Sequence, residues 1–393
     1  MNDLLLLLQE KQTNQFIVDN LFADTSQILL NPPAQFKEHI SHIVDQIISR
    51  RKAKSKLPEW FANQNLIMPP PLSLEQCSSR STAAYKKQFL SGNHLIDLTG
   101  GMGIDTLALS ENFNQTTYVE QYDWLCDVFE FNAKQLGKNI ETINWNAEEV
   151  LAELETKAHF FIDPARRDEN KKQVFHFQNC SPNLIELLPL FEQKAESVLV
   201  KAAPMIDISL GIQQLKYVTE VHVVSVKNEV KEVLFLLEFD KSKEPEITCA
   251  NLETDQPKLS FLLDEEKDET VEFSTIGNYL YDPNASILKA GAFKTIARKY
   301  KLKKLAVNTH LYTSDKLIKN FPGRVFEVVN PDCSKKDISQ LLSDGKANVI
   351  TKNYPMKPEE LKKKFKLKDG GDWFLIGYRD EKNKARLTLC RYA

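Results

Sequence analysis

The sequence predicts an α/β protein whose central sheet is mostly parallel. Between residues 86 and 240, short apolar runs alternate with helical patterns, which is typical of parallel strands connected by helices. The first run ends in Leu95-Ile-Asp-Leu-Thr-Gly-Gly-Met-Gly-Ile104, where a glycine-rich turn leads into a helical pattern. A strand, a tight loop and a helix N-terminus in this order hold a nucleotide-like cofactor against the backbone.

Local patterns predict the elements in chain order. Residues 1–85 form a helical region, because apolar side chains between Phe36 and Ile48 recur at intervals of three or four. Seven strands are expected, near residues 94–98, 116–120, 140–144, 159–163, 197–201, 220–226 and 232–239. From Asp240 to residue 275 there are eleven acidic residues and four lysines, which predicts an acidic hairpin or linker at 241–275.

The composition of the glycine loop narrows the choice of cofactor. The loop contains Gly100, Gly101 and Gly103. Their spacing does not fit the dinucleotide fingerprint, and no lysine is present to grip a phosphate chain. Instead, Asp97 and Asp105 place acids beside the loop, and Glu120 follows at about the distance expected of a carboxylate that binds ribose. These features favour S-adenosylmethionine over NAD or ATP, and a purely structural glycine turn is the alternative.

Three successive motifs resemble those of class I methyltransferases. They are Asp97-Leu-Thr-Gly-Gly-Met-Gly-Ile-Asp105, Glu120 and Asp163-Pro-Ala-Arg-Arg167. The longer pieces Leu74-Glu-Gln-Cys-Ser-Ser79 and Lys201-Ala-Ala-Pro-Met-Ile-Asp207, with the C-terminal segment, resemble one bacterial family in particular. In that family a methyltransferase domain is joined to a small ferredoxin-like domain and a THUMP-like domain.

The resemblance covers nearly the whole chain and implies its fold. It implies a seven-stranded Rossmann-like sheet with an antiparallel last strand, in a methyltransferase domain at 86–240. Small α+β domains are then expected at 276–325, ferredoxin-like, and at 326–393, THUMP-like.

The resemblance also implies which residues bind the cofactor. The expected set is Asp97, Thr99, Gly100, Gly101, Gly103, Asp105, Glu120, Gln121, Asn146 and Asp163. Asp97 is expected to meet the amino group and Glu120 the ribose hydroxyls. Asn146 stands where such enzymes usually have an aspartate that contacts adenine, although it is also a good N-cap for a helix that begins at Ala147.

The catalytic candidates follow the fourth and fifth predicted strands. Asp163 is expected at the carboxyl edge of the sheet, where ligands bind. Methyltransferases that modify base amines carry an aromatic ring in this motif, but Ala165 and Arg166 stand here, so the stacking ring is missing. Lys201 is the second candidate, either as an anchor for a phosphate or as a base.

Three further side chains near these candidates have two interpretations each. Arg166 and Arg167 either hold a substrate phosphate or pair with the acids that follow them. Cys180 permits a covalent thiolate mechanism, but a small buried side chain is the favoured interpretation.

Composition limits the partners of the chain. The net charge is −3, so any affinity for RNA must come from local patches, and from Pro331 onward fifteen Lys or Arg residues oppose nine acids. The six cysteines form no C-x-x-C pair and the histidines show no paired spacing, so no metal site is expected. The short apolar run Leu4–Leu8 predicts an amphipathic helix, not a signal peptide, and no membrane span is expected, which favours a cytoplasmic location.

Three functions follow from these observations. The first is a methyltransferase that acts on structured RNA, either rRNA or tRNA, with the basic C-terminal units holding the RNA. The second is a methyltransferase for a protein or small molecule, in which the C-terminal units dock a partner. The third is a scaffold that binds cofactor or RNA without catalysis.

Overall fold

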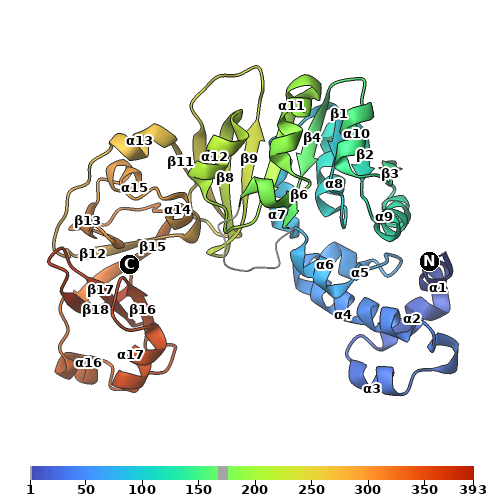
Figure 1. Ribbon diagram of the computed structural model, residues 1–393. Coiled ribbons are helices and arrows are strands. Elements are labelled where there is room, and N and C mark those ends of the chain that lie inside the picture. The colour runs from blue at the N-terminus through green and yellow to red at the C-terminus, as the bar shows by residue number, and fades with distance from the viewer. Residues whose placement is uncertain (1, 167–175) are drawn as a thin grey trace. The chain divides into compact units, whose positions relative to one another are not determined.

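The computed structural model describes residues 2–166 and 176–393 (Figure 1). The chain divides into two compact units. The first comprises residues 1–219 with 234–242, and the second comprises residues 220–233 with 243–393.

The N-terminal region of the first unit is helical. Its α-helices are α1 (Asn2–Gln9), α2 (Lys11–Asp19), α3 (Thr25–Leu30), α4 (Ile40–Lys56), α5 (Pro58–Ala62), α6 (Pro71–Gln76) and α7 (Arg80–Lys86). The apolar face predicted around Phe36–Ile48 is present on α4, where Ile43, Val44 and Ile47 are buried. This region shares a core with the sheet domain, because Trp60 and Leu74 belong to the same cluster as Tyr118 and Phe129.

The larger sheet contains nine strands in the described part of the chain, not the seven predicted. The predicted seven are β1 (Gly92–Asp97), β2 (Phe113–Val119), β3 (Glu141–Ile143), β4 (Ala158–Ile162), β7 (Ala195–Ala202), β8 (Val218–Val226) and β9 (Glu229–Leu237). The two additional strands are β10 (Glu246–Leu252) and β11 (Leu259–Leu262), which pair antiparallel in the segment predicted to be an acidic hairpin or linker. Strand β10 pairs in parallel with β8, and its side chains from Ile247 to Asn251 are buried, so this edge of the sheet is extended.

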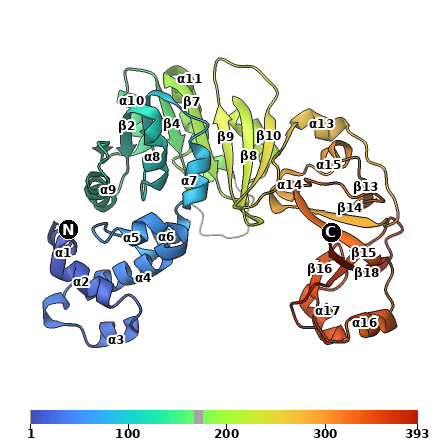
Figure 2. The same ribbon diagram turned by 180° about the vertical axis from the view of Figure 1, so that it is seen from behind.

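The strand order is β11-β10-β8-β9-β7-β4-β1-β2-β3. Strand β1 pairs in parallel with both β2 and β4, so the direction of winding reverses between β1 and β4. The connecting helices are α8 (Ile104–Leu109), α9 (Asp123–Gln135), α10 (Ala147–Glu153), α11 (Leu184–Lys194) and α12 (Ile208–Leu215). Helices α8 to α11 are labelled in Figure 2, and α12 is labelled in Figure 1. A further two-stranded pair, β5 (Ala165–Arg166) and β6 (Cys180–Ser181), lies outside this sheet.

The second unit contains a seven-stranded sheet in the order β13-β14-β12-β15-β18-β17-β16. The strands are β12 (Tyr279–Pro283), β13 (Lys303–Ala306), β14 (Thr309–Ser314), β15 (Gly323–Asn330), β16 (Asn348–Lys352), β17 (Phe374–Arg379) and β18 (Ala385–Tyr392). Its helices are α13 (Leu263–Asp268), α14 (Ala285–Ala290), α15 (Thr295–Lys299), α16 (Lys335–Leu341) and α17 (Pro358–Phe365).

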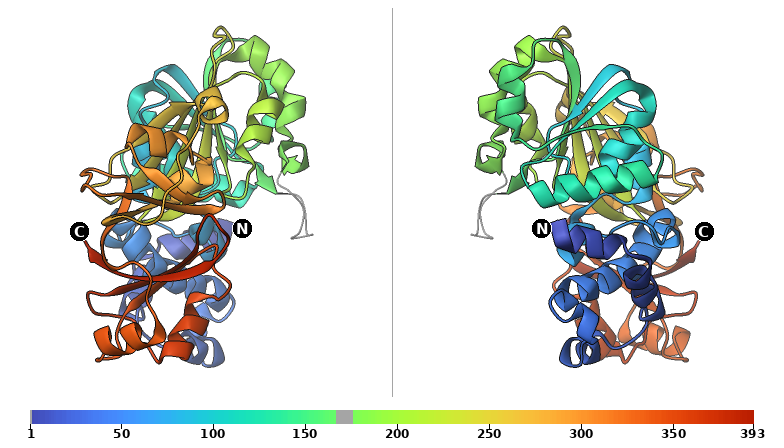
Figure 3. Two further views of the ribbon diagram at one scale, coloured as in Figure 1. Left: turned by 90° about the vertical axis from the view of Figure 1, so that its left-hand side faces the viewer. Right: turned by 90° about the vertical axis from the view of Figure 1, so that its right-hand side faces the viewer.

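Alternating side chains give the last strands of this sheet two buried faces. Phe374 and Ile376 of β17 point into a core that also contains Leu280 and Leu311 from the earlier strands. Leu375, between them, packs in a second core with side chains of α16. Accordingly, α16 and α17 lie on one side of β16–β18 in both views of Figure 3.

Candidate active site

The glycine loop between β1 and α8 is shaped by two aromatic rings. A Cβ atom at Gly100 would lie 2.1 Å from the Tyr118 ring, and one at Gly103 would lie 2.1 Å from the Phe129 ring. These two rings stack on each other, with their centroids 3.8 Å apart. Glycine is therefore required at both positions by packing alone, whatever ligand the loop holds.

Gly101 is the loop glycine that faces open space. Its φ is +53°, in the left-handed region that favours glycine. Apart from its chain neighbours, the nearest described atom to a Cβ here would be the Thr99 carbonyl oxygen, 3.8 Å away. The Tyr118 hydroxyl donates a hydrogen bond of 2.6 Å to the Gly101 carbonyl and fixes the peptide. Gly101 thus presents bare backbone to a space that a ligand can fill.

The Glu120 carboxylate joins this loop to the end of β2. One oxygen accepts a hydrogen bond of 2.9 Å from the Gly101 N–H, and the other accepts one of 3.1 Å from the Tyr122 N–H. The side chain is buried in this position. The sequence spacing between the glycines and Glu120 therefore corresponds to direct contact in space.

The loops after β1 and β4 are tied together where the strand order reverses, which is the place where open α/β sheets bind ligands. Thr99 Oγ1 accepts a hydrogen bond of 2.7 Å from the Asp163 N–H. Asp97, at the end of β1, is buried and accepts hydrogen bonds of 3.0 Å from the Thr99 N–H and 2.5 Å from the Thr106 hydroxyl. Burial raises the pKa of Asp97 to about 7.

Four side chains of alternating charge extend from the interior to the sheet edge. The Nζ atom of Lys86 lies 3.3 Å from Asp105 Oδ1, and that of Lys201 lies 3.5 Å from Asp105 Oδ2. The Nζ atom of Lys201 is also 2.5 Å from Asp163 Oδ2. Lys86 is fully enclosed, whereas 38% of the Asp163 side chain is exposed. The network thus ends at the sheet edge in the pair of Asp163 and Lys201, of which Asp163 is partly exposed.

Asp105 is the charged centre of this network. The Ser78 hydroxyl donates a hydrogen bond of 2.7 Å to its Oδ2 atom. Burial opposes ionisation of Asp105, but Lys86, Lys201 and Ser78 together hold its pKa below the ordinary value. The predicted contact of Asp105 with a cofactor stays a prediction, since its described partners belong to the protein.

Sequence reasoning singled out neither Ser78 nor Lys86 as a site residue. Ser78 lies in the segment 74–79 that carries the family resemblance, so that segment held a usable signal. Lys86 lies in no motif, and its neighbour Lys87 pairs at the surface with Glu111. Only the structure shows that Lys86 is buried and Lys87 lies at the surface.

Two residues predicted to bind the cofactor, Gln121 and Asn146, lie beyond the ends of β2 and β3. Gln121 is exposed. Asn146 is the N-cap of α10, and its Oδ1 atom accepts a hydrogen bond of 2.8 Å from the Glu149 N–H, as the N-cap interpretation predicts. Exposed aromatic side chains adjoin both residues, because Tyr122 follows Gln121 and Trp145 precedes Asn146. The predicted cofactor contacts of Gln121 and Asn146 stay predictions.

The whole chain matches a solved structure. The crystal structure of a "putative methyltransferase from Porphyromonas gingivalis W83" is 32% identical to the chain. The match covers 97% of this chain and 98% of that chain, with a TM-score of 0.86. The chain belongs to this methyltransferase family. The resemblance inferred from the sequence motifs is therefore confirmed.

Two family models match the second unit of this methyltransferase family member. Residues 279–322 match a ferredoxin-like domain, and residues 323–392 match a THUMP domain-like family. The boundary between the matches falls immediately before β15, which pairs antiparallel with β12 of the preceding domain. The two domains therefore share one sheet.

Other solved structures match only part of the chain. TrmK of M. capricolum, in complex with S-adenosyl-homocysteine, is 12% identical and covers 41% of this chain and 68% of its own, with a TM-score of 0.32. An rRNA methylase from Streptococcus thermophilus is 14% identical and covers 40% of this chain and 94% of its own, with a TM-score of 0.31. No curated protein matches the chain.

The remaining predicted residues of this methyltransferase lie near the loop after β4. Arg167 is outside the described residues, and for Arg166 the structure describes the backbone in β5 but not the side chain. Their role in substrate binding stays a prediction. Cys180 in β6 is buried, and its thiol donates to the His176 carbonyl at 3.6 Å, in agreement with the structural interpretation.

The basic stretch at residues 50–56 bonds to the protein itself. Arg50 is buried and donates to the carbonyls of Asn63 and Leu66, at 2.9 and 2.6 Å. Lys56 donates to the carbonyls of Leu74 and Glu75. Because Arg50 and Lys56 donate to backbone carbonyls within the protein, their charges contribute little to binding a phosphate.

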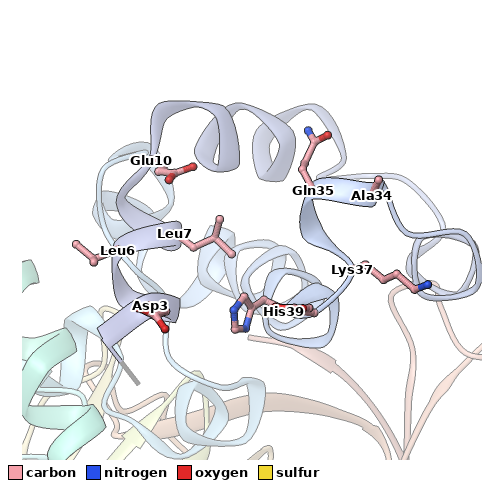
Figure 4. Close-up of a pocket in the computed structure, with 9 residues that line it drawn as sticks. Asp3, Leu6, Leu7, Glu10, Ala34, Gln35, Lys37 and His39 are labelled. Carbon is pink, nitrogen blue, oxygen red and sulfur yellow. The ribbon is translucent and has the colours of Figure 1, made fainter.

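Membrane spans and metal sites are both absent from the described residues. None of the helices there is long and apolar enough to span a membrane, and no group of three His, Cys, Asp or Glu side chains suits a metal ion. A surface pocket lies in the N-terminal region, between Leu6, Leu7 and Glu10 on one side and Gln35 and His39 on the other (Figure 4). Its lining contains none of the predicted site residues.

Proposed function

We propose that this protein is an S-adenosylmethionine-dependent methyltransferase that acts on structured RNA, either rRNA or tRNA. One observation carries the proposal. The hydrogen bond from Gly101 to Glu120 and the hydrogen bond from Asp163 to Thr99 both hold the glycine loop where the strand order reverses. This supports a cofactor site and an acid–base pair at the same edge of one sheet.

The residues at this edge fit the cofactor. Gly101 offers backbone without a side chain, and Glu120 offers carboxylate oxygens beside it for ribose hydroxyls. Asp163 places a partly exposed carboxylate beside the loop, which suits the positive charges of the cofactor and not a phosphate chain. When bound, the cofactor supplies a methyl group on a sulfonium, which is a good leaving group.

The protein's own residues then have two tasks, to align the acceptor and to exclude water. Asp163 is exposed enough to accept a hydrogen bond from an acceptor N–H or O–H and to take its proton. Lys201, held against Asp163 at 2.5 Å, keeps that carboxylate oriented and balances its charge. Asp97 and Glu120 stabilise the conformation of the glycine loop, because they accept hydrogen bonds from its backbone N–H groups.

The second unit supports RNA as the substrate class. A THUMP domain-like family matches residues 323–392, and the basic residues of the chain are concentrated there. On α17 and just after it, Lys363, Lys364, Lys366 and Lys368 are exposed. Such a cluster can bind phosphates even though the chain as a whole is slightly acidic.

The test is the transfer of labelled methyl from S-adenosylmethionine into extracts of cells that lack this protein, because their sites are unmodified. Label in an rRNA or tRNA fraction is the expected result. Label found only in protein or in small molecules would show that the methyl acceptor is not RNA. Cofactor binding without any label would favour the scaffold function.

A further inference from the structure

Lys86 is a buried cation that belongs to none of the sequence motifs. It ends α7, and its side chain has no exposed surface. A lysine is almost never fully buried unless it is paired, and one partner here is Asp105, 3.3 Å away in α8. A helix of the N-terminal region thus contributes a charge to the network behind the glycine loop.

Asp105 connects Lys86 to the proposed active site. Its second oxygen lies 3.5 Å from the Nζ atom of Lys201, whose other partner is Asp163 at 2.5 Å. Lysine has a flexible four-carbon stem, so a single contact leaves its ammonium group loosely placed. Contacts with Asp105 on the inner side and Asp163 on the outer side fix the ammonium of Lys201 at the sheet edge.

The charge of Asp105 depends on its surroundings. The ionisable groups that face it are Lys86 from α7, Lys201 from β7, Asp97 from β1, Asp163 after β4 and Cys77 before α7. Burial raises the pKa of Cys77 to about 11, so this thiol stays neutral, and the repulsion between Asp97 and Asp105 opposes ionisation of both. The two lysines and the Ser78 hydroxyl therefore keep Asp105 ionised.

We propose that Lys86 is a positioning residue for methyl transfer, which holds Asp105 as the carboxylate that anchors Lys201 beside Asp163. This inference rests on the proposed function and deepens it. Lys86 touches neither cofactor nor acceptor; it acts through Asp105. The inference also assigns Asp105 to the protein's internal network and not to the cofactor.

The inference predicts a specific change in the pH profile. In Lys86→Met the burial of Asp105 is unchanged but one cation is removed, so its pKa rises. Below that raised pKa, Asp105 takes up a proton, Lys201 is no longer anchored on its inner side, and kcat falls about tenfold for each further pH unit. The wild type lacks this acid limb. The affinity for S-adenosylmethionine, measured by calorimetry, stays within about threefold of the wild type because no group that touches the cofactor is removed.

A double variant distinguishes a positioning role of Lys86, through the charge of Asp105, from a role in packing alone. In Lys86→Met/Asp105→Asn the group that titrates is gone, so kcat is low but the additional acid limb disappears. Lys87→Met is the matched control, because Lys87 is adjacent but pairs at the surface with Glu111, and its profile follows the wild type. Asp105→Asn alone lowers kcat without the additional limb, and this variant decides the matter if Lys86→Met does not fold.

The outcomes are distinguishable. A pH profile in Lys86→Met identical in shape to that of the wild type, or wild-type kcat in Asp105→Asn, overturns this inference and leaves the proposed function intact. If the wild type transfers no methyl to any fraction, the proposed function fails, and the positioning role for transfer fails with it.

Discussion

Thr99 Oγ1 accepts a hydrogen bond of 2.7 Å from the backbone N–H of Asp163, across the point where the strand order reverses. This bond fixes the proposed acceptor site relative to the glycine loop without using the Asp163 side chain. A single hydroxyl thereby sets the separation between the cofactor loop and the residue proposed to meet the substrate.

Substitution of Thr99 tests this relationship. Thr99→Val leaves the Asp163 N–H without its acceptor, so the free energy of unfolding falls by about 1–3 kcal/mol and methyl transfer falls as well. Thr99→Ser retains the hydroxyl and is the control, with transfer close to that of the wild type. Equal transfer by the valine and serine variants would show that the bond does not position Asp163.

The space above Gly101 predicts the effect of a side chain there. Gly101→Val abolishes binding of S-adenosylmethionine, because the side chain fills the space that the ligand needs. The substitution also strains the backbone at φ +53°, so the control is Gly137→Val, at a glycine with φ +69° and no described neighbour within 4 Å. Calorimetry on both variants checks this, and unchanged affinity in Gly101→Val would remove the loop from the site.

Asp163 is expected to act on the acceptor and not on binding of the cofactor. Asp163→Ala removes methyl transfer but preserves most of the affinity for S-adenosylmethionine, since the backbone N–H that bonds to Thr99 is retained. Asp19→Ala, at an exposed position on α2, is the control. A large loss of affinity, with transfer per bound complex unchanged, would reassign Asp163 to the cofactor.

The pKa of Asp97 links the stability of the fold to pH. Burial raises this pKa from 3.8 to about 7 in the folded protein. Between these values the native state holds a proton that the unfolded chain releases, so the free energy of unfolding falls with rising pH, by about 1.4 kcal/mol per unit at most. Above about pH 7 the effect is complete.

The Asp97→Asn variant has no carboxyl group that titrates at this position, so comparison with the wild type isolates the contribution of Asp97 to the pH dependence of stability. Urea unfolding of both proteins is measured across this pH range, and the wild type is expected to lose stability relative to the variant as the pH rises. Asparagine can still accept from the Thr99 N–H, so the loop is retained. A difference that stays constant with pH would contradict the raised pKa.

The basic surface of α17 predicts how RNA binding depends on salt. Replacement of Lys363, Lys364 and Lys368 by glutamine weakens binding to the RNA substrate and reduces the slope of log affinity against log salt, by about one for each phosphate that these lysines neutralise. The matched control replaces three exposed lysines of the first unit, Lys11, Lys37 and Lys157. Equal slopes for the two triple variants would exclude α17 from the RNA interface.

The sequence predicted the sheet domain well because its signals are local. The apolar runs, the glycine turn and the spacing to Glu120 each fall within a few tens of residues, and the structure places the loop and Glu120 in contact. The segment predicted to be an acidic hairpin or linker contains the antiparallel strands β10 and β11. Its acidic composition did not indicate that β10 also pairs with β8, with the side chains from Ile247 to Asn251 buried, and so extends the larger sheet.

The site was predicted only where a motif marked it. Asp163 and Lys201 were named as separate candidates, and their 2.5 Å contact appeared only in the structure. Lys86 could not have been found, because the pairing partner of a buried lysine is set by packing between α7 and α8, not by spacing along the chain. Gly100 and Gly103 were attributed to ligand approach, whereas the rings of Tyr118 and Phe129 already require them.

The hydrogen-bonded pairing of β12 with β15 has a consequence for how the two C-terminal domains fold and unfold. The two C-terminal domains have separate family models, yet they have one sheet and one set of buried side chains between them. A chain ended at residue 322 would keep the ferredoxin-like sequence but expose the full length of β12 to other chains. We therefore expect the two domains to unfold together, in a single cooperative transition.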